Sequence, residues 1–529
     1  MRLLNYITIS LVAILSLSGC SSYDESPVNP DDGGPGTYLR LKMYVAPGSR
    51  SNPEAGETGD GLEDGTAAEN RIDNLTIFIY NSRYGLDAPE DTRVNYSVYI
   101  PTVEVNQSGV IVSCLIKLQN YTPTTDDHII VLANMGNQTR LETLGEIAAF
   151  KDFAAWTAAS MPAACSSFAM ATARNTADDG VIKFRDNMGI LPGTQEQPLY
   201  AETSIERVAA RIDLWFDDAN IDADGNFIYP VYTSTGSRQT ATVHIDKVIP
   251  VNAMQLSPWA LKHLTNSVSD DMSCFSDLNL CGDELVGNDR LPVNYVVEPT
   301  TVLKTASMTI PPASWYGNTG AAVLRADITG ALDAAPAVSA YKSTHRPSPD
   351  ADHQRFFTLT YVNENTQHLS AHDSRFITGL LYRAVYEPHT VYTDAEASAV
   401  ASTYRRGDTF WCYRPSRHEM LEDDVLYFAS ESAARSYASA HPGDQATVTE
   451  YPGAICYYNL WLRHANNDKS NPHRTCPMEY GVVRNNIYRV SVTFSGAGQP
   501  RPLIDEPMNI RYRIFVRKWN FRPQPEIIM

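Results

Sequence analysis

Short segments in which apolar and polar residues alternate recur along this 529-residue chain. A period of two places successive side chains on opposite faces of an extended strand, so each such segment predicts a half-buried β-strand. In the first of them, Tyr38–Val45, one side consists of Leu39, Leu41, Met43 and Val45. In the last, Asn509–Trp519, one side consists of Ile510, Tyr512, Ile514 and Val516. The series of predicted strands therefore starts and finishes with strands of matching pattern.

Further segments of strand character lie between these two. They are Ile72–Tyr80, Val94–Val105, Gly109–Leu118, His128–Ala133, Ile205–Phe216, Ala241–Pro250, Phe356–Tyr361, Thr378–Val385 and the end of Tyr480–Phe494. Short helices are expected at Thr139–Ala158, Thr393–Arg405 and Ser430–Ala440 from apolar spacing or Ala-rich composition. With 10% aromatic and 19% charged residues, the composition favours a β-rich extracellular protein. The length allows two such domains, which we expect to divide near residue 228.

The first residues have the parts of a secretion signal. Arg2 is followed by an apolar run, Leu3–Leu17, that is too short to span a bilayer, and then by Ser18-Gly19-Cys20. A Leu-x-Gly-Cys ending resembles the bacterial lipobox, in which the cysteine is lipidated, for example with palmitate. We therefore predict a signal peptide at residues 1–19, a lipid on Cys20, and a polar tether over Ser21–Gly36.

Charge and cysteine content exclude some classes of partner and site. The formal net charge of −19 argues against nucleic acid and anionic lipid as partners. Seven cysteines remain besides Cys20, and an odd number cannot all pair within one chain. Cys274 with Cys281, or Cys456 with Cys476, would close short loops, and the spacing leaves both pairings open. No CxxC pair is present, which disfavours a structural zinc site.

The sequence singles out no catalytic residues, metal site or cofactor. No Gly-x-Ser-x-Gly elbow, P-loop or His-Glu-x-x-His motif occurs. His368 and His372 are four residues apart, but no clear helix or special carboxylate accompanies them. The segment from Asn220 to Gly225 copies the front of a calcium loop, yet Val231 stands where the loop needs a bidentate Glu. A β-turn is the preferred interpretation there.

Several segments, taken in order, resemble those of a known family. They are the lipobox at Cys20, the strand and Arg50 loop that follow, Ile72–Tyr80, Val131–Gly136, Glu206–Ile212, Val483–Tyr488 and Phe515–Trp519. The chain resembles the fimbrillins, the pilin superfamily of Bacteroidetes type V pili, and particularly their major (stalk) subunit branch. The resemblance covers nearly the whole chain, which is longer than a typical stalk subunit.

The resemblance implies a mainly β fold of two transthyretin-like β-sandwich domains with a few short helices. It implies export as an outer-membrane lipoprotein and cleavage by a trypsin-like, Arg-specific protease in the loop after the first strand. In this sequence the scissile bond is Arg50–Ser51, and Arg71 is the second choice. The expected parts are a lipidated linker with a removable strand (20–50), two domains (51–228 and 229–505) and a C-terminal donor segment (506–529).

The same resemblance implies assembly by strand exchange. Removing the strand that contains Leu39, Leu41, Met43 and Val45 would leave an apolar groove with unpaired backbone on both sides. The C-terminal segment of another subunit, with Ile510, Tyr512, Ile514 and Val516, would fill it as an added strand. The expected product is a cell-surface fimbrium made of this subunit and accessory pilins.

Two other functions stay open at this stage. The chain could be an accessory or tip pilin with adhesive function, which predicts poor self-polymerisation after cleavage. It could also be a surface glycan-binding lipoprotein or hydrolase, which predicts a carbohydrate ligand and no response to protease.

Overall fold

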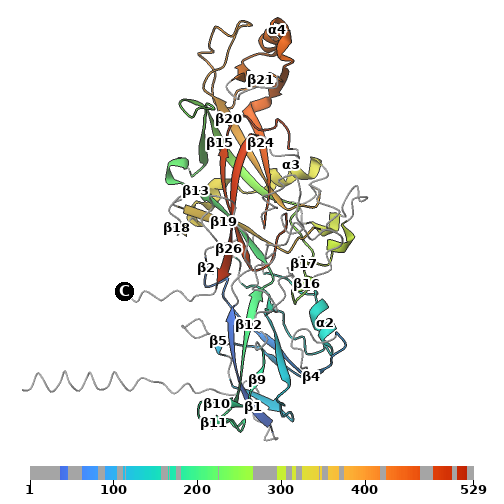
Figure 1. The fold of residues 1–529 in the computed structure, drawn as a ribbon. Coiled ribbons are helices and arrows are strands. Elements are labelled where there is room, and N and C mark those ends of the chain that lie inside the picture. Colours follow the sequence, from blue (N-terminus) through green and yellow to red (C-terminus); the bar gives the residue numbers. More distant parts are fainter. Residues whose placement is uncertain are drawn as a thin grey trace, which may run out of the picture.

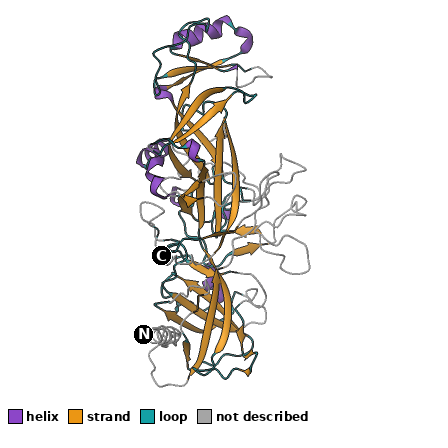
Figure 2. Ribbon diagram, turned by 90° about the vertical axis from the view of Figure 1, so that its left-hand side faces the viewer, coloured by secondary structure: helices purple, strands orange, loops and turns teal. Residues whose placement is uncertain are grey.

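The computed structural model describes residues 36–45, 62–81, 90–103, 111–112, 115–156, 165, 167–173, 180–223, 225–265, 295–304, 313–316, 325–344, 346–347, 355–367, 375–416, 424–464, 480–502 and 509–520. Most of the secondary structure in these residues is β-strand, and helices are few and short. The predicted mainly β fold is therefore confirmed. The molecule is elongated, with its sheets following one another along the long axis (Figures 1 and 2).

The lower part of the molecule in Figure 1 is built on a nine-stranded sheet. Its strands follow the order β4-β3-β7-β8-β12-β1-β5, with β6 also paired to β1 and β9 to β12. The bounds are β1 Gly36–Val45, β3 Leu75–Asn81, β4 Val94–Ile100, β5 Ile111–Val112, β6 Ile116–Gln119, β7 Asp127–Ala133, β8 Met170–Thr172, β9 Ile182–Lys183 and β12 Leu199–Arg207.

Two hydrophobic clusters lie on the two faces of this sheet. On β3, Ile77 and Ile79 belong to one cluster together with residues of β1, β6 and β12, so the sheet encloses a common core. The alternate residues Phe78 and Tyr80 belong to the other cluster, which contains Leu144 and Ile147 of helix α2 (Leu144–Ala149). Because both faces are covered, β3 is buried over six consecutive residues.

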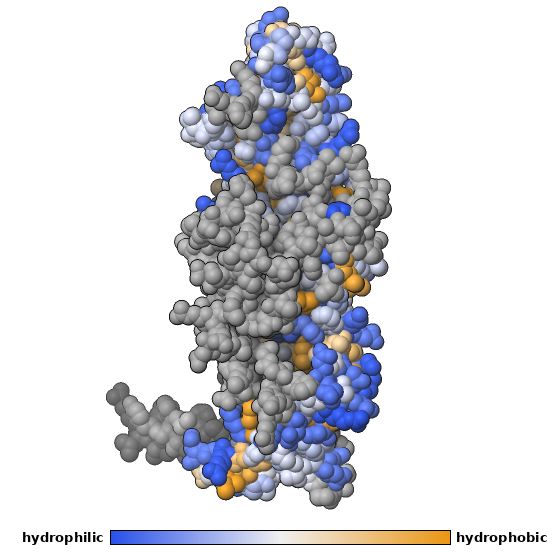
Figure 3. All heavy atoms as spheres, turned by 45° about the vertical axis from the view of Figure 1, so that its right-hand side comes forward, coloured by the Kyte–Doolittle hydropathy of each residue, from blue (hydrophilic) through white to orange (hydrophobic). Residues whose placement is uncertain are grey.

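A hairpin closes the lower end of the molecule. Its strands are β10 (Arg185–Asp186) and β11 (Gly189–Ile190), and both Met188 and Ile190 are strongly exposed. In Figure 3 hydrophobic surface is visible at that end of the face shown.

The chain passes from the first sheet to the second at Val208 and Ala209, both fully buried. The next strand, β13 (Ala210–Phe216), already pairs with β19 and β25 in the second sheet. A boundary at residue 228 would cut β14 (Phe227–Tyr232), so the sheets favour a division close to residue 209. The predicted single strand Ile205–Phe216 is therefore two strands in two different sheets.

The middle of the molecule is a β-sandwich. One sheet has the order β18-β19-β13-β25-β26-β2 and the other has the order β14-β15-β20-β24. Side chains of both sheets form one large core that includes Leu214, Val243, Tyr382 and Tyr488. The bounds are β2 Leu62–Asp64, β15 Gln239–Val251, β18 Arg346–Pro347, β19 Arg355–Val362, β20 Gly379–Pro388, β24 Ile455–Trp461, β25 Asn486–Phe494 and β26 Ile510–Asn520.

The remaining elements lie above and beside the sandwich. The upper end in Figure 1 carries a three-stranded sheet, β22-β21-β23, with helix α4 packed on it. The bounds are β16 His263–Thr265, β17 Tyr295–Val297, η3 Asp218–Asn220, η5 Thr301–Leu303, η6 Ala313–Trp315, α3 Arg325–Ala334, η7 Val338–Thr344, β21 Phe410–Arg414, β22 Leu426–Phe428, α4 Glu431–Ala440, η9 Pro442–Asp444, β23 Thr447–Tyr451 and η10 Pro452–Ala454. Within the described residues, no helix has the length and apolar character needed to cross a membrane.

The helix predictions have mixed outcomes. Helix α4 follows Ser430, whose side chain caps it, as the Ala-rich segment predicted. Among the described residues of the long predicted segment, Thr139–Trp156, only Leu144–Ala149 is helical. The helix expected at Thr393–Arg405 is wrong, because the Asp394 carboxylate accepts hydrogen bonds from the amides of Ser398 and Ala399 and closes a loop instead.

Candidate functional site

Strand β1 is paired on both of its edges. On one side it runs parallel to β12, from Leu39 opposite Leu199 to Val45 opposite Ile205. On the other side it runs antiparallel to β6, from Gly36 opposite Gln119, and to β5, with Met43 opposite Ile111. A strand paired in this way fills a slot in the sheet, and its removal exposes backbone groups along both walls.

The side chains of β1 alternate as the sequence predicted. Leu39, Leu41 and Met43 are fully buried in the core of the first sheet. On the opposite face, Lys42 is half-buried and its Nζ lies 3.5 Å from Oε1 of Glu202 on β12. The side chain of Val45, the fourth predicted residue, lies outside the described residues.

The start of β1 is held by a close approach of another segment. The amide of Tyr38 donates to the carbonyl of Gly193 at 2.8 Å. Gly193 has φ +73, and a Cβ there would lie 2.6 Å from Cγ2 of Thr37. Only glycine allows this approach without displacing the strand.

The predicted processing sites differ in what the structure describes. Arg50 and Ser51, like Cys20, lie outside the described residues. Arg71 is described: its side chain is exposed, but Asn70 and Ile72 on either side of it are buried. The Arg71 carbonyl also accepts a hydrogen bond from Nδ2 of Asn134 at 2.8 Å. A protease needs an extended, accessible backbone, so this geometry disfavours cleavage at Arg71.

A buried ion network joins the segment that follows β1 to the second sheet. Glu69 accepts from Nη1 of Arg211 at 3.0 Å, and the same guanidinium donates to Asp213 at 2.8 Å and to Glu63. Arg489 donates to Asp213 at 2.8 Å and to Glu63. Glu69 is 1% exposed, and Arg211, Asp213 and Arg489 are fully buried.

Two further groups extend the network to both parts of the molecule. Nε of Arg207, the last residue of β12, donates to the Glu69 carbonyl at 2.9 Å. The hydroxyl of Tyr361 on β19 donates to the Glu69 carboxylate at 2.7 Å. The network therefore fixes β2 and the residues after it independently of β1.

The charges of the network set the ionisation of its carboxylates. Burial alone raises the pKa of Glu69, but the guanidinium of Arg211, with a smaller contribution from Arg346, overcomes this and lowers the pKa. The pKa of Asp213 is likewise lowered, because Arg211 and Arg489 outweigh burial. For Arg207 burial dominates and lowers the pKa to about 9. These charges hold Glu69 and Asp213 as anions at neutral pH.

The predicted donor strand lies within its own sandwich in this structure. β26 pairs antiparallel with β25 from Phe494 opposite Ile510 to Asn486 opposite Lys518. Its end also pairs in parallel with β2. Ile510, Ile514 and Val516 are buried in the sandwich core, with Tyr512 packed against it. Phe515, on the other face, packs edge-on against Trp215.

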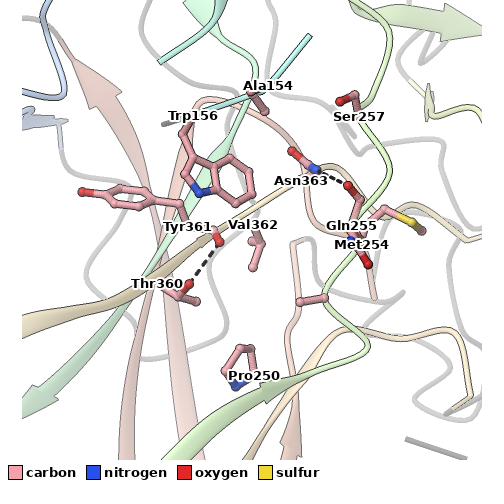
Figure 4. Close-up of a pocket in the computed structure, with 12 residues that line it drawn as sticks. Ala154, Trp156, Pro250, Met254, Gln255, Ser257, Thr360, Tyr361, Val362 and Asn363 are labelled. Atoms are coloured by element: carbon pink, nitrogen blue, oxygen red, sulfur yellow. Dashed lines mark hydrogen bonds between the residues drawn. The ribbon is translucent and has the colours of Figure 1, made fainter. Parts of the chain in front are cut away.

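A cavity of about 390 Å³ lies where the first and second sheets meet (Figure 4). Trp156 and Tyr361 lie beside each other on one wall, and Gln255 lies on the other. The amide of Asn363 donates to the backbone carbonyl of Leu256 at 3.0 Å. The lining thus presents mainly apolar surface and backbone, with no charged side chain among the described lining residues.

The other sequence candidates give no metal or redox site among the described residues. No group of three or more His, Cys, Asp or Glu side chains is placed there to hold a metal. Asp222 accepts from the amide of Asn226 at 2.8 Å, so this segment is the predicted turn. His368 and His372 lie outside the described residues. Cys456 is a buried free thiol, which leaves the Cys456–Cys476 pairing unformed, and burial raises its pKa to about 11.

Comparison with known proteins gives a family match for the C-terminal part of the chain. Residues 449–523 match the family model described as the C-terminal part of fimbrillin, major fimbrial subunit protein type IV. This part of the chain is therefore similar to the fimbrillins. The matched residues include β24, β25 and β26. No curated protein sequence matches the chain.

Solved structures similar to this chain include fimbrial and cell-adhesion proteins. A fimbrilin (fimA) from Porphyromonas gingivalis is 14% identical, with 92% of this chain and 99% of that chain covered and a TM-score of 0.41. A putative cell adhesion protein from Bacteroides eggerthii is 12% identical, with 95% and 100% covered and a TM-score of 0.35. The tip fimbrial protein Mfa3 from P. gingivalis is 9% identical, with 92% and 100% covered and a TM-score of 0.34.

Proposed function

We propose that this protein is a fimbrillin and a structural subunit of a cell-surface pilus. It is exported as a lipoprotein through Cys20 and held at the outer membrane until an Arg-specific protease cuts Arg50–Ser51. The cut releases β1, and the emptied slot accepts a strand from the C-terminal segment of another subunit. The protein then acts as a structural element and not as an enzyme.

The observation that carries this proposal is the placement of β1. It is paired on both edges and buries Leu39, Leu41 and Met43, and Arg50 follows it by five residues in the sequence. Glu63 and Glu69, beyond that loop, are anchored to Arg211 by the ion network. A cut between β1 and this anchor separates a removable strand from a fixed body.

Head-to-tail donation explains how such a subunit forms a fibre. The slot lies in the first sheet and β26 lies in the second, so donor and acceptor are different surfaces of the chain. A heterologous contact of this kind need not close and extends as a filament. The alternatives, an accessory or tip pilin and a glycan-binding lipoprotein, predict no filaments from the cut protein alone.

Cleavage at Arg50 is expected to convert soluble subunits into filaments. The test is limited digestion of the full chain with an Arg-specific protease, followed by gel analysis and electron microscopy. Arg50→Ala is expected to abolish filaments, and the matched variant Arg71→Ala is expected to leave them unchanged because its backbone is held. Filaments from undigested protein, or undiminished filaments from digested Arg50→Ala, would contradict the proposal.

A disulfide between β25 and β26 tests the donor strand. Thr493 lies opposite Arg511, and both side chains are exposed. Opposite residues of antiparallel strands have Cα atoms about 4.5–5.5 Å apart, which suits a disulfide. The double variant Thr493→Cys/Arg511→Cys is expected to be cut normally but to form filaments only after reduction. Filaments formed under oxidising conditions would assign donation to residues outside 510–516.

Locking is a sharper test than deletion of the donor segment. Deleting residues 506–529 would remove Ile510, Ile514 and Val516 from the sandwich core. The deleted protein would lack these contacts before any exchange takes place, so a loss of filaments would not distinguish donation from a loss of stability. The disulfide leaves these contacts in place and is reversed by a reductant.

A further inference from the structure

Lys304, Glu298 and Asn365 form a buried cluster away from the β1 slot. Glu298 follows β17, Lys304 follows the short helix η5, and Asn365 lies just beyond the end of β19. The exposed fraction is 2% for Glu298, 0% for Lys304 and 1% for Asn365. Charged side chains are almost never buried to this degree without a specific reason.

The Lys304 amine contacts both of the other side chains. Its Nζ lies 2.7 Å from Oε1 of Glu298 and 2.6 Å from Oδ1 of Asn365. It also donates to the backbone carbonyl of Thr366 at 2.7 Å. Because a C=O bond is about 1.2 Å long, Nζ lies within roughly 3.8 Å of Cγ of Asn365. That separation is close to the one from which bound groups react.

The amide of Asn365 is fixed in the orientation that turns its carbonyl toward the amine. Its Nδ2 donates to the carbonyl of Phe376 at 2.8 Å and to Oγ1 of Thr378 at 2.7 Å. Oδ1 is left to the amine of Lys304 and to Nε2 of Gln367, which lies 3.3 Å away. The Gln367 amide is therefore placed to stabilise negative charge on this oxygen.

The surroundings favour an uncharged amine. Burial lowers the pKa of Lys304, and the attraction of Glu298 offsets this only in part. The Glu298 carboxylate, which also accepts from the amide of Thr300 at 2.7 Å, is in direct contact with the protons that the amine must lose. A neutral amine next to an amide carbon is a nucleophile placed at an electrophile.

We propose that Lys304 and Asn365 form an intramolecular isopeptide bond with Glu298 as the proton acceptor. Glu298 takes one proton from the ammonium, and the free Nζ attacks Cγ of Asn365. Glu298 passes that proton to Nδ2 and takes the remaining proton that Nζ gives up. The Nζ–Cγ bond forms, the Cγ–Nδ2 bond breaks, and Nδ2 leaves as ammonia while Glu298 ends protonated. No oxidant, metal or other reactant is needed.

The bond would join two segments that are distant in sequence. It would connect the segment after β17 to the end of β19, where the backbone of Asn365 already pairs with that of Val482 ahead of β25. A covalent link there restricts unfolding of the intervening chain. This inference does not depend on strand exchange and stands or falls separately from it.

Intact-mass spectrometry of the purified full-length protein, with peptide mapping, tests the proposal. The expected mass is lower than that of the sequence by one molecule of ammonia. Tryptic digestion should give a branched peptide that joins the Lys304 and Asn365 segments. Lys304→Met and Glu298→Gln are expected to restore the full sequence mass. The matched control Lys262→Met, which breaks another largely buried pair, with Glu206, is expected to keep the loss.

The outcomes separate the bond from its alternatives. A wild-type protein with the full sequence mass would overturn the proposal and leave a buried ion pair. Loss of ammonia without a branched peptide, or its persistence in Lys304→Met, would assign the loss to cyclisation elsewhere and also overturn it. The wild-type measurement decides the matter even if a variant fails to fold.

Discussion

Arg211→Met is expected to lower the free energy of unfolding by about 3–5 kcal/mol, the usual cost of removing one partner of a buried ion pair. Arg211 is fully buried and contacts Glu63, Glu69 and Asp213 at once. Methionine fills a similar length but leaves three carboxylates without this cation, and Arg489 still contacts only two of them. Urea or guanidinium unfolding of the intact chain measures the loss.

The matched control is Arg435→Met on helix α4. Arg435 forms an exposed i,i+4 pair with Glu431 at 2.7 Å, and such pairs contribute about 0–1 kcal/mol. A loss for Arg211→Met no larger than that of the control would show that the network contributes little to stability.

The same network makes stability depend on pH in a defined direction. The carboxylates of Glu69 and Asp213 have lowered pKa values in the folded state, so the unfolded chain takes up protons first as the pH falls. Their contribution is complete above the unfolded values near pH 4 and declines below them. The difference between the wild type and Arg211→Met is therefore expected to shrink in acid, which the same unfolding measurements at several pH values record.

A disulfide between β1 and β12 is expected to abolish polymerisation without preventing cleavage. Lys42 and Glu202 are paired in register and their side chains already face each other at 3.5 Å. Neighbouring strands lie about 4.8 Å apart, within the Cα range of disulfides. In Lys42→Cys/Glu202→Cys the cut β1 stays in its slot, and the slot cannot accept another strand.

The strength of β1 in its slot explains why a cut is needed. Burying Leu39, Leu41 and Met43 contributes about 1.5–3 kcal/mol each, or roughly 4.5–9 kcal/mol as an upper bound. While β1 is covalently attached, a competing strand also faces its high effective concentration. Cleavage removes the advantage of high effective concentration and leaves only the burial energy of β1. A strand from another subunit that buries at least as much apolar surface can then replace β1.

The control for Lys42→Cys/Glu202→Cys is the same protein after reduction of the disulfide. Filaments are expected to return when the disulfide is broken, and each single cysteine variant is expected to polymerise normally. Normal filaments from the oxidised, cut double variant would mean that assembly does not use the β1 slot.

The strands at the two ends could be predicted because their signal is local. The alternation in Tyr38–Val45 and in Asn509–Trp519 coincides with β1 and β26, since a period of two depends only on neighbouring residues. The break at Val208 and Ala209 could not be predicted. The sequence has no turn residue such as Gly, Pro or Asn there, and only pairing with distant strands separates β12 from β13.

The buried networks were beyond sequence reasoning for the same reason. Glu69 meets Arg211, and Lys304 meets Asn365, across long stretches of chain. The available signal was two arginines, Arg207 and Arg211, inside an apolar strand segment where charge is unfavourable. Such residues indicate buried partners but do not identify them.

The composition of the filaments tests the central claim most directly. Filaments grown from cut protein should be separated from free peptide, dissolved and analysed by mass spectrometry. The account predicts that their subunits begin at Ser51 and that the peptide containing β1 is found only in the supernatant. Filaments that retain this peptide in equal amount to the subunit would show that β1 never leaves its slot, and strand exchange at this site would be wrong.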